Sequence, residues 1–346
     1  MPPSPSPQRL LELIAAMAGQ PVLMLADLVA DRFVTGAPKR ISREAPVLIL
    51  RFEHEELLPG GGANAVANVA ALGGRPLPLG VVGDDASGAE LLTALAALGV
   101  TTEGIRRRPG FRTPTKVRIL AGHRHAIKQQ VVRYDVEGPL SLGDDDRAFL
   151  RQRLADWAGQ APVAVLSDYG YGAVEPELVA DCRAAVGPEG TVLCDSRYRL
   201  AHFRGLDGAT PNEEEAETLL GAPLGEDAAG LRHAGERLLE RVGSRFLLVT
   251  RGSLGMSLFR RGGAVHVPVH GTDQVADVTG AGDTVIGTFA LALAAGGDPL
   301  EAALLANYAG GIVVMKRGTA TLTRDELRDA VASDPHPLEE LRWERS

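Results

Sequence analysis

Four short apolar runs in this chain each end at a polar residue, and segments with helical periodicity separate them. The runs cover residues 21–26, 163–166, 191–194 and 246–249, and the polar residues are Asp27, Asp168, Asp195 and Thr250. Nearly continuous apolar strands that alternate with helices predict a doubly wound α/β fold, in which helices cover both faces of a mostly parallel sheet. Ligands bind beyond the carboxyl ends of such strands, so the four polar residues mark a candidate site.

Two stretches lack this alternation, residues 31–58 and 108–137. Their strand-like segments at 47–52, 116–120 and 129–135 predict a small β lid built from two inserts. Segments 8–30, 59–107 and 138–332 then form the α/β core. Residues 1–7 and 333–346 are expected to be tails without apolar periodicity. Within the core, Ser87 and Glu90 match a capping box, and Arg106–Arg108 is expected to be an exposed run.

Charge and composition argue against several classes of protein. The 36 Lys and Arg residues against 44 Asp and Glu give a net charge of −8, which argues against a nucleic-acid-binding protein. No apolar segment of about 18 residues predicts a membrane span, and Met1–Pro7 lacks the basic and apolar regions of a signal peptide. Cys182 and Cys194 lie in apolar runs and are expected to be buried free thiols. Together these features predict a cytoplasmic protein.

The most specific motif is Asp277-Val-Thr-Gly-Ala-Gly-Asp283, which leads into a predicted helix from Ala281 to Ala295. Gly280 and Gly282 let backbone amides converge, and a helix N-terminus adds partial positive charge, so the loop is predicted to bind an anion. Asp283 is either an ordinary first-turn acid or a general base beside a phosphoryl group. Two glycines that bracket an alanine before the acid, at the start of a helix, favour the base.

This segment resembles the signature of the ribokinase-like (PfkB-type) carbohydrate kinases, and the resemblance extends from about residue 21 to 330. Pro59–Asn68 is similar to the family's glycine motif at the sugar site, and Thr210–Glu215 to its Asn-x-x-Glu motif. Thr250–Gly255 resembles the loop under the nucleotide phosphates, and Ala306-Asn307 the helix that flanks the adenine.

Within the family, the chain most resembles the D-glycero-β-D-manno-heptose 7-phosphate kinases of lipopolysaccharide-precursor synthesis. The stretches that carry this resemblance are Asp31–Phe33, Arg40–Val47, Leu166–Tyr169 and Arg133–Asp135. Many members are fused to a nucleotidyltransferase with a His-x-Gly-His motif. The sequence has no such motif, so a stand-alone kinase is expected. Three positions depart from the family pattern: Ala26 replaces a Gly, Tyr171 a Lys, and Ser196-Arg197 a Pro-Lys pair.

The resemblance implies an ATP-dependent kinase that transfers the γ-phosphoryl group to a sugar hydroxyl with Mg²⁺ and, in some members, K⁺. It implies that Asp283 is the base and that Gly280, Ala281 and Gly282 supply stabilising amides. The sugar or its phosphate would contact Asp27, Asp31, Gly61, Gly62, Asn64, Asn68, Lys116, Arg133, Asp168 and Arg197. The nucleotide would contact Asn212, Thr250, Gly252, Ser253, Gly255 and Asn307. Glu215 would bind Mg²⁺ through water, and Asp277 and Thr279, with the carbonyls of Val313, Lys316 and Gly318, a monovalent cation.

Simpler explanations remain open for several of these segments. Gly60–Gly62 fits a tight turn or, loosely, a dinucleotide fingerprint; Asn212 with Glu215 fits a helix cap; Thr250–Gly252 fits a strand-end turn. His123 and His125 fit a solvated strand face better than a metal site. The sequence contains neither a P-loop motif nor the protein-kinase motifs.

Other acceptors and one other class of protein also stay open: a hexose, pentose or nucleoside kinase, and a non-catalytic sugar- or nucleotide-sensing module. Four cations in or near the lid, Arg32, Arg40, Lys116 and Arg133, favour a phosphorylated acceptor. The exposed strand edges of the lid predict a homodimer through it.

Overall fold

The computed structural model describes residues 5–122, 128–138, 140–225, 228–271 and 276–345. A ten-stranded sheet runs through the core in the order β14-β13-β12-β11-β10-β9-β8-β1-β4-β5. Its strands are β1 (Pro21–Ala26), β4 (Arg75–Gly83), β5 (Ile105–Arg108), β8 (Val163–Asp168), β9 (Thr191–Ser196), β10 (Gly208–Ala209), β11 (Phe246–Thr250), β12 (Met256–Arg260), β13 (Gly263–Val267) and β14 (Arg342–Arg345). Pairing is parallel from β5 to β11 and antiparallel from β11 to β14. The predicted doubly wound, mostly parallel sheet is confirmed.

Helices cover both faces of this sheet, because successive strand residues point to opposite sides. On one face Val22 and Met24 of β1 pack in a core with α1 (Pro7–Ala16), α2 (Gly62–Ala71), α3 (Ala86–Ala97), α8 (Ala281–Ala294), α9 (Pro299–Val313) and α10 (Arg324–Ser333). On the other face Leu23 and Leu25 pack with α4 (Asp144–Asp156), α5 (Leu178–Val186), α6 (Glu213–Leu220) and α7 (Ala228–Val242). Short helices complete the chain at Leu200–His202, Gly252–Leu254 and, as α11, His336–Glu339.

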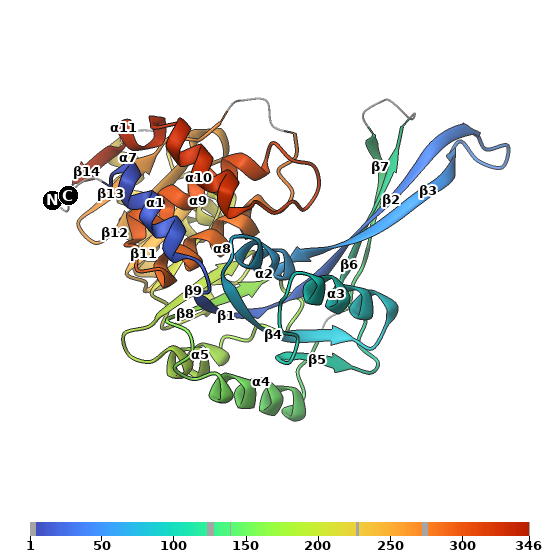
Figure 1. Cartoon of the computed structure of the whole chain (residues 1–346), viewed down its shortest axis with the longest axis horizontal. Coiled ribbons are helices and arrows are strands. Elements are labelled where there is room, and N and C mark those ends of the chain that lie inside the picture. Colours follow the sequence, from blue (N-terminus) through green and yellow to red (C-terminus); the bar gives the residue numbers. More distant parts are fainter. Residues whose placement is uncertain (1–4, 123–127, 139, 226–227, 272–275, 346) are drawn as a thin grey trace.

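A second sheet of four strands projects from the core, in the order β3-β2-β6-β7 (Figure 1). Its strands are β2 (Leu28–Ile41), β3 (Leu48–Gly61), β6 (Thr115–Ala121) and β7 (Gln129–Val136). β2 starts two residues after β1 ends, and β3 runs directly into α2. The small sheet therefore begins inside the segments predicted as core, and its base lies beside the carboxyl end of β1.

The C-terminal segment differs from the expected unpacked tail. Residues 342–345 form β14, which pairs antiparallel with β13 at the edge of the large sheet. Leu338, Leu341 and Trp343 pack against the main core. Three apolar residues within a charged segment give no periodicity of their own, so only the sheet edge reveals this strand.

Two local predictions also need correction. Arg106–Arg108 belongs to edge strand β5, where Arg106 and Arg108 pair with the buried carboxylate of Asp146 at 3.0 and 2.9 Å. The N-cap of α3 is Asp85, whose side chain accepts a hydrogen bond from the amide of Gly88, so the helix starts two residues before the expected capping box at Ser87 would place it.

Cys182 and Cys194 are buried free thiols, as expected, and burial raises the pKa of Cys182 to about 12. None of the described helices combines the length and the apolar character needed to cross a bilayer. His123 and His125 lie outside the described residues.

Candidate functional site

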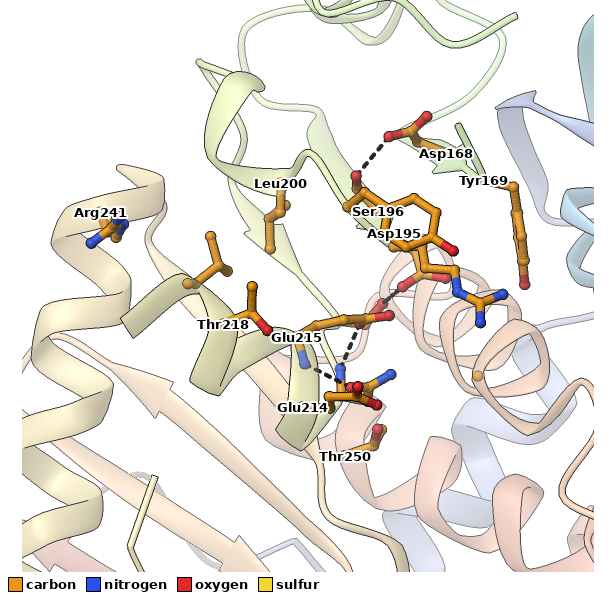
Figure 2. A pocket seen from close by; sticks show the side chains of 16 residues that line it. Asp168, Tyr169, Asp195, Ser196, Leu200, Glu214, Glu215, Thr218, Arg241 and Thr250 are labelled. Carbon is orange, nitrogen blue, oxygen red and sulfur yellow. Dashed lines mark hydrogen bonds between the residues drawn. The ribbon is translucent and has the colours of Figure 1, made fainter. Parts of the chain in front are cut away.

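A cavity of about 730 Å³ opens at the carboxyl ends of β8, β9 and β11 (Figure 2). Asp168, Asp195 and Thr250 line it, each from the end of one of these strands, and Gly282 borders it at the start of α8. Three of the four polar strand ends therefore meet at one cavity, as parallel strand order requires. The fourth, Asp27, does not line it.

Asp283 is the third residue of α8 and is almost completely buried, with 2% of its surface exposed. The hydroxyl of Tyr169 donates to one of its carboxylate oxygens at 2.6 Å, and the Asn64 amide donates to the other at 3.0 Å. Burial raises the pKa of Asp283 to about 7, although both hydrogen bonds act to lower it. This carboxyl can exchange a proton near neutral pH.

The start of α8 is shaped for an anion. Gly280 is the N-cap with φ of 78°, and a Cβ there would collide with the Asn64 amide nitrogen. A Cβ on Gly282 would meet no atom within 4 Å, so this backbone faces open space in the cavity. The first-turn amides of a helix carry partial positive charge and lack partners within the helix, so the loop can bind a phosphoryl group.

Two acidic side chains, Glu215 and Asp195, line the same cavity as Gly282. Glu215 accepts the amide of Asn212 at 2.9 Å while the Asn212 side chain accepts the amide of Glu215, so the pair forms a capping box. Burial raises the pKa of Glu215, and burial followed by the charge of Glu215 raises that of Asp195 well above its usual value. The simpler cap interpretation is correct, and the same residues still line the cavity.

These carboxyls fit a divalent cation that bound phosphate oxygens also ligate. Among the described residues, no group of three or more His, Cys, Asp or Glu side chains could hold a metal alone. Mg²⁺ uses few carboxylates and keeps water or phosphate oxygens as its other ligands. A nearby cation would remove the cost of ionising Asp195 and Glu215 together.

Some of the residues expected at the nucleotide line the cavity and others do not. Thr250 lines the cavity, while Gly252 and Ser253 lie in the exposed short helix after β11, where a Cβ on Gly252 (φ 55°) would meet no atom. Gly255 is buried with φ of 82°, so it serves the turn into β12. Asn307 is buried and donates to the carbonyl of Pro268 at 2.9 Å, which ties α9 to the segment after β13.

Asp27 and Asn68 are buried and have hydrogen-bond partners within the protein. The Asp27 carboxylate accepts the backbone amides of Tyr169, Tyr171 and Ala173, each at 2.9 Å, so it fixes the loop after β8. Burial raises its pKa to about 6. Asn68 is fully buried and donates to the carbonyl and side-chain oxygens of Asn64. Neither side chain lines this cavity or the smaller one beside the lid, and Asp27 fixes the loop that carries Tyr169; contact of the two side chains with the sugar stays a prediction.

A second cavity of about 300 Å³ lies between the lid and the loops after β8 and β9. Lys116, Arg133 and Arg197 line it, together with Asp135, Glu137 and Tyr171. The Lys116 ammonium group lies 5.2 Å from the ring centroid of Tyr169, and burial lowers its pKa. The Arg133 guanidinium makes a bidentate pair with Asp135 at 2.8 and 2.6 Å. Tyr169 and Arg197 line both cavities.

The remaining substrate candidates are also placed. Asp31 pairs with the buried Arg118 at 2.7 Å, and a Cβ on Gly60 would lie 2.6 Å from its carboxyl carbon. Gly61, with φ of 50°, and Gly62 lead into α2 beside Val29 and Ala26.

Asp168 accepts the Ser196 hydroxyl at 2.6 Å and pairs with Arg199. Arg32 pairs with Glu55 and Glu90, and like Arg40 it lines neither cavity.

Asp277 connects the two segments that were expected to bind a monovalent cation, residues 277–279 and 313–318. Its carboxylate accepts the amides of Thr279 at 2.9 Å and Gly318 at 3.0 Å. Burial acts to raise the pKa of Asp277, but these hydrogen bonds hold it below the ordinary value. The Val313 carbonyl accepts the amide of Lys316, and that of Gly318 accepts the amide of Ala320, both at 2.9 Å.

Sequence reasoning did not assign roles to Tyr169, Arg118 and Arg199, and it marked Asp195 only as a polar strand end. Tyr169 had a signal, since it directly follows Asp168 at the end of β8. Arg118 and Arg199 had none, because their partners Asp31 and Asp168 lie 87 and 31 residues away.

Comparison with known proteins identifies the family. A family model described as pfkB family carbohydrate kinase matches residues 27–326. The chain belongs to the pfkB family of carbohydrate kinases. It is therefore a phosphotransferase that acts on a sugar hydroxyl.

Among the relatives of this pfkB kinase are proteins called Bifunctional protein HldE. The one from Mesorhizobium japonicum is 42% identical over 332 residues, which cover 94% of this chain and 65% of that protein. The one from Pseudomonas aeruginosa is 42% identical over 313 residues, which cover 90% and 63%. The kinase thus spans less than two thirds of the length of these relatives.

Solved structures share the fold of the kinase. Arabidopsis thaliana ribokinase complexed with ribose and ATP matches with a TM-score of 0.69 and 23% identity, over 92% of this chain and 100% of that one. Phosphofructokinase-2 from Escherichia coli in complex with substrates and products matches with a TM-score of 0.71 and 20% identity, over 91% and 99%. At these identities the likeness concerns the fold alone.

Proposed function

We propose that this pfkB kinase transfers the γ-phosphoryl group of ATP to a hydroxyl of a heptose 7-phosphate. The observation that carries the proposal is the contact between two cavities: the one lined by Lys116, Arg133 and Arg197 shares Tyr169 with the one beside Asp283. A sugar with a reacting hydroxyl at one end and a phosphate at the other suits this arrangement. The resemblance of residues 31–33, 40–47 and 166–169 to heptose 7-phosphate kinases supports the same acceptor.

Asp283 acts as the general base. As the acceptor oxygen bonds to the γ-phosphorus, its proton passes to the Asp283 carboxylate, the bond from phosphorus to the β–γ bridging oxygen breaks, and ADP leaves with that electron pair. A base whose pKa is about 7 suits neutral pH. Tyr169 and Asn64 hold the carboxylate from both sides.

Charge on the transferring group is stabilised by the first-turn amides of α8. The left-handed conformation of Gly280 turns the chain so that the amides of Ala281, Gly282 and Asp283 begin the helix. Phosphoryl transfer depends mainly on positioning and on electrostatic stabilisation of the phosphate oxygens. The absence of a Cβ on Gly282 leaves the approach open.

The ATP phosphates extend from α8 toward Thr250, Gly252 and Ser253, with the cap of Asn212 on the other side. Asp195 and Glu215 hold Mg²⁺ together with phosphate oxygens, which supplies positive charge to the β- and γ-phosphates. The junction of Asp277 and Thr279 with residues 313–318 binds a monovalent cation such as K⁺. ATP use and buried free thiols suit the cytoplasm.

A neutral hexose or pentose is the competing acceptor, and one observation favours it. Arg133 is already paired with Asp135, and Glu137 adds a second carboxylate to the same cavity. Lys116 and Arg197 are then the cations left for a phosphate. Both remain directed at the small cavity that borders Tyr169, and this supports the phosphorylated acceptor.

The test compares heptose 7-phosphate, the same sugar without phosphate, ribose and fructose at fixed ATP and Mg²⁺. The phosphorylated heptose should have the highest kcat/KM, by about tenfold to a few hundredfold over its dephosphorylated form. Charge-assisted bonds to a phosphate stabilise by about 1.5–3 kcal/mol each, and 1.36 kcal/mol is tenfold. Equal or better use of a neutral sugar would replace this assignment with the neutral-sugar kinase.

We also propose that the kinase forms a homodimer through the lid. The two faces of the small sheet differ. Lys116, paired opposite Asp135, and Arg118, opposite Arg133, lie on one face with Asp31. The other face carries Val34, Ile119, Val132, Tyr134 and Phe52, with the Arg32–Glu55 ion pair nearer the core, and the part beyond this pair is called the apolar face.

On this apolar face, Phe52, Val132 and Tyr134 are 62%, 51% and 53% exposed. A sheet face of this kind, bounded by the strand edges of β3 and β7, requires a cover. A second copy of the same face supplies one with twofold symmetry, and it leaves the polar face turned toward the substrate.

A further inference from the structure

Tyr169 touches three separate parts of the site. Its backbone amide donates to Asp27 at 2.9 Å, the Lys116 ammonium lies 5.2 Å from its ring centroid, and its hydroxyl donates to Asp283 at 2.6 Å. Asp27 lies between β1 and β2, Lys116 belongs to β6, and Asp283 belongs to α8. The phenol is thereby fixed between the two cavities, both of which it lines.

The two donors to Asp283 differ in how freely they can leave. Asn64 also donates to the carbonyl of Gly280 at 3.3 Å and accepts from Asn68 at 3.1 Å, so its amide is held in place. The Tyr169 hydroxyl can turn about its C–O bond without moving the ring. An incoming hydroxyl therefore reaches Asp283 at the oxygen that Tyr169 occupies.

We propose that Tyr169 is the positioning residue of the base: its hydroxyl orients the Asp283 carboxylate and keeps that oxygen from accepting a proton from water until a sugar hydroxyl takes its place. The proposal rests on the function proposed above for Asp283. Hydrolysis would have the same balance as transfer. A water oxygen bonds to the γ-phosphorus, its proton passes to Asp283, and ADP leaves. A carboxylate oxygen already engaged by Tyr169 is a poor acceptor for that proton.

The surroundings keep Tyr169 a donor. Burial, followed by the charges of Asp283 and Asp195, raises its pKa well above the ordinary value. Around Asp283, the negative charge of Asp31 raises its pKa, whereas Lys116 and the two hydrogen bonds lower it. Removal of the Tyr169 hydroxyl therefore shifts Asp283 toward the protonated, inactive form.

The test is Tyr169→Phe, assayed with the best acceptor of the wild-type kinase and again without any acceptor. The acidic limb of kcat/KM for the sugar should move to higher pH by about one to two units, the effect of one hydrogen bond to a charged group. The ratio of ATP hydrolysis without acceptor to sugar phosphorylation should rise about tenfold. The KM for ATP should stay within about twofold.

Tyr198→Phe is the matched control, because Tyr198 lines both cavities but makes no contact with Asp283 among the hydrogen bonds of the described residues. It should leave the acidic limb unmoved. Site-specific 3-fluorotyrosine at position 169 retains the ring and strengthens the donor, so the limb should move to lower pH. This variant keeps the test decisive if Tyr169→Phe folds poorly.

The experiments distinguish failure of the proposed base, Asp283, from failure of the proposed positioning role of Tyr169. Asp283→Asn that retains the wild-type rate would overturn the base, and the role of Tyr169 with it. If Asp283→Asn is inactive but the limb and the hydrolysis ratio are the same in wild type, Tyr169→Phe and the fluorotyrosine variant, the positioning role of Tyr169 alone is overturned.

Discussion

Asn64 on α2 donates a 3.0 Å hydrogen bond to Asp283 on α8, although 219 residues separate the two in the chain. Helix α2 follows the lid strand β3 and α8 follows the glycine loop at residues 280–282, so this bond joins the lid side of the site to that loop. Because Gly280 must lack a side chain for Asn64 to approach, the glycine and the asparagine are constrained together.

Asp283→Asn should bind ATP with nearly wild-type affinity and lose about 10²–10⁴-fold in turnover. This is the usual contribution of a positioned base, and it corresponds to about 3–5 kcal/mol of activation free energy. ADP formation with saturating acceptor measures the rate, and calorimetric titration measures ATP binding. A variant with more than about a tenth of the wild-type rate would contradict the base.

The pH profile of wild-type kcat/KM for the sugar should have an acidic limb near pH 7. Activity should fall as the pH drops through this value, because protonated Asp283 accepts no proton and its pKa is about 7. Initial rates between pH 5 and 9 with a saturating Mg²⁺–ATP complex give the limb. A limb near pH 4 would show that the base is an ordinary exposed carboxylate.

Lys116→Met and Arg197→Met should each reduce kcat/KM for the phosphorylated acceptor by about tenfold or more. The same variants should change kcat/KM for the dephosphorylated sugar by less than about threefold, since a neutral sugar has no phosphate to pair. Arg40→Met is the matched control, because Arg40 lies on β2 outside both cavities. Equal losses with both sugars would indicate damage to the site rather than loss of phosphate binding.

Phe52→Ser combined with Val132→Ser should dissociate the dimer. Each exposed apolar side chain contributes about 1.5–3 kcal/mol when fully buried, and each is counted twice in a symmetric interface. Sedimentation at micromolar concentration measures the effect, with Leu98→Ser as a control for an exposed apolar residue on the core. A wild-type monomer at that concentration would refute the interface.

Asp27→Asn should change the free energy of unfolding by an amount that depends on pH, because burial gives Asp27 a different pKa in the folded and the unfolded chain. Burial raises the pKa of Asp27 in the folded protein to about 6, above the ordinary value of an aspartate. The carboxyl's contribution is therefore complete below about pH 4 and is lost as the pH rises through 6.

The destabilisation should accordingly be smaller at pH 8 than at pH 5. Urea unfolding at the two pH values measures it, with the exposed helix residue Asp156→Asn as control. A penalty that grows with pH would contradict burial as the cause of the raised pKa.

The sequence predicts the core well where a segment is both apolar and long. Residues 21–26 match β1, residues 163–166 and 191–194 lie within β8 and β9, and the helix predicted from Ala281 matches α8. It fails where tertiary contacts decide: β5 holds three consecutive arginines, and β14 gains its strand structure from the edge of β13.

The same distinction applies to the candidate site: positions within a local motif can be predicted, and partners brought together by the fold cannot. Asp283, Gly282 and Thr250 are found from motif and strand position, because local sequence determines the loop and the helix start. The bonds of Asp27 to the loop after β8 could not be predicted, because only the fold brings Ala173 near it, 146 residues along the chain. Tyr169 becomes significant only when α8 places Asp283 against it.

Two register shifts interrupt the long hairpin of β2 and β3, one between Thr35 and Gly36 and one between Pro38 and Arg40. A bulge bends a strand and breaks the ladder locally, so each shift acts as a hinge between the tip of the hairpin and its base. Asp31 and its partner Arg118 lie on the near side of both hinges. Insertions or substitutions beyond residue 40 can thus change the tip of the hairpin while Asp31 and Arg118 at its base keep their geometry.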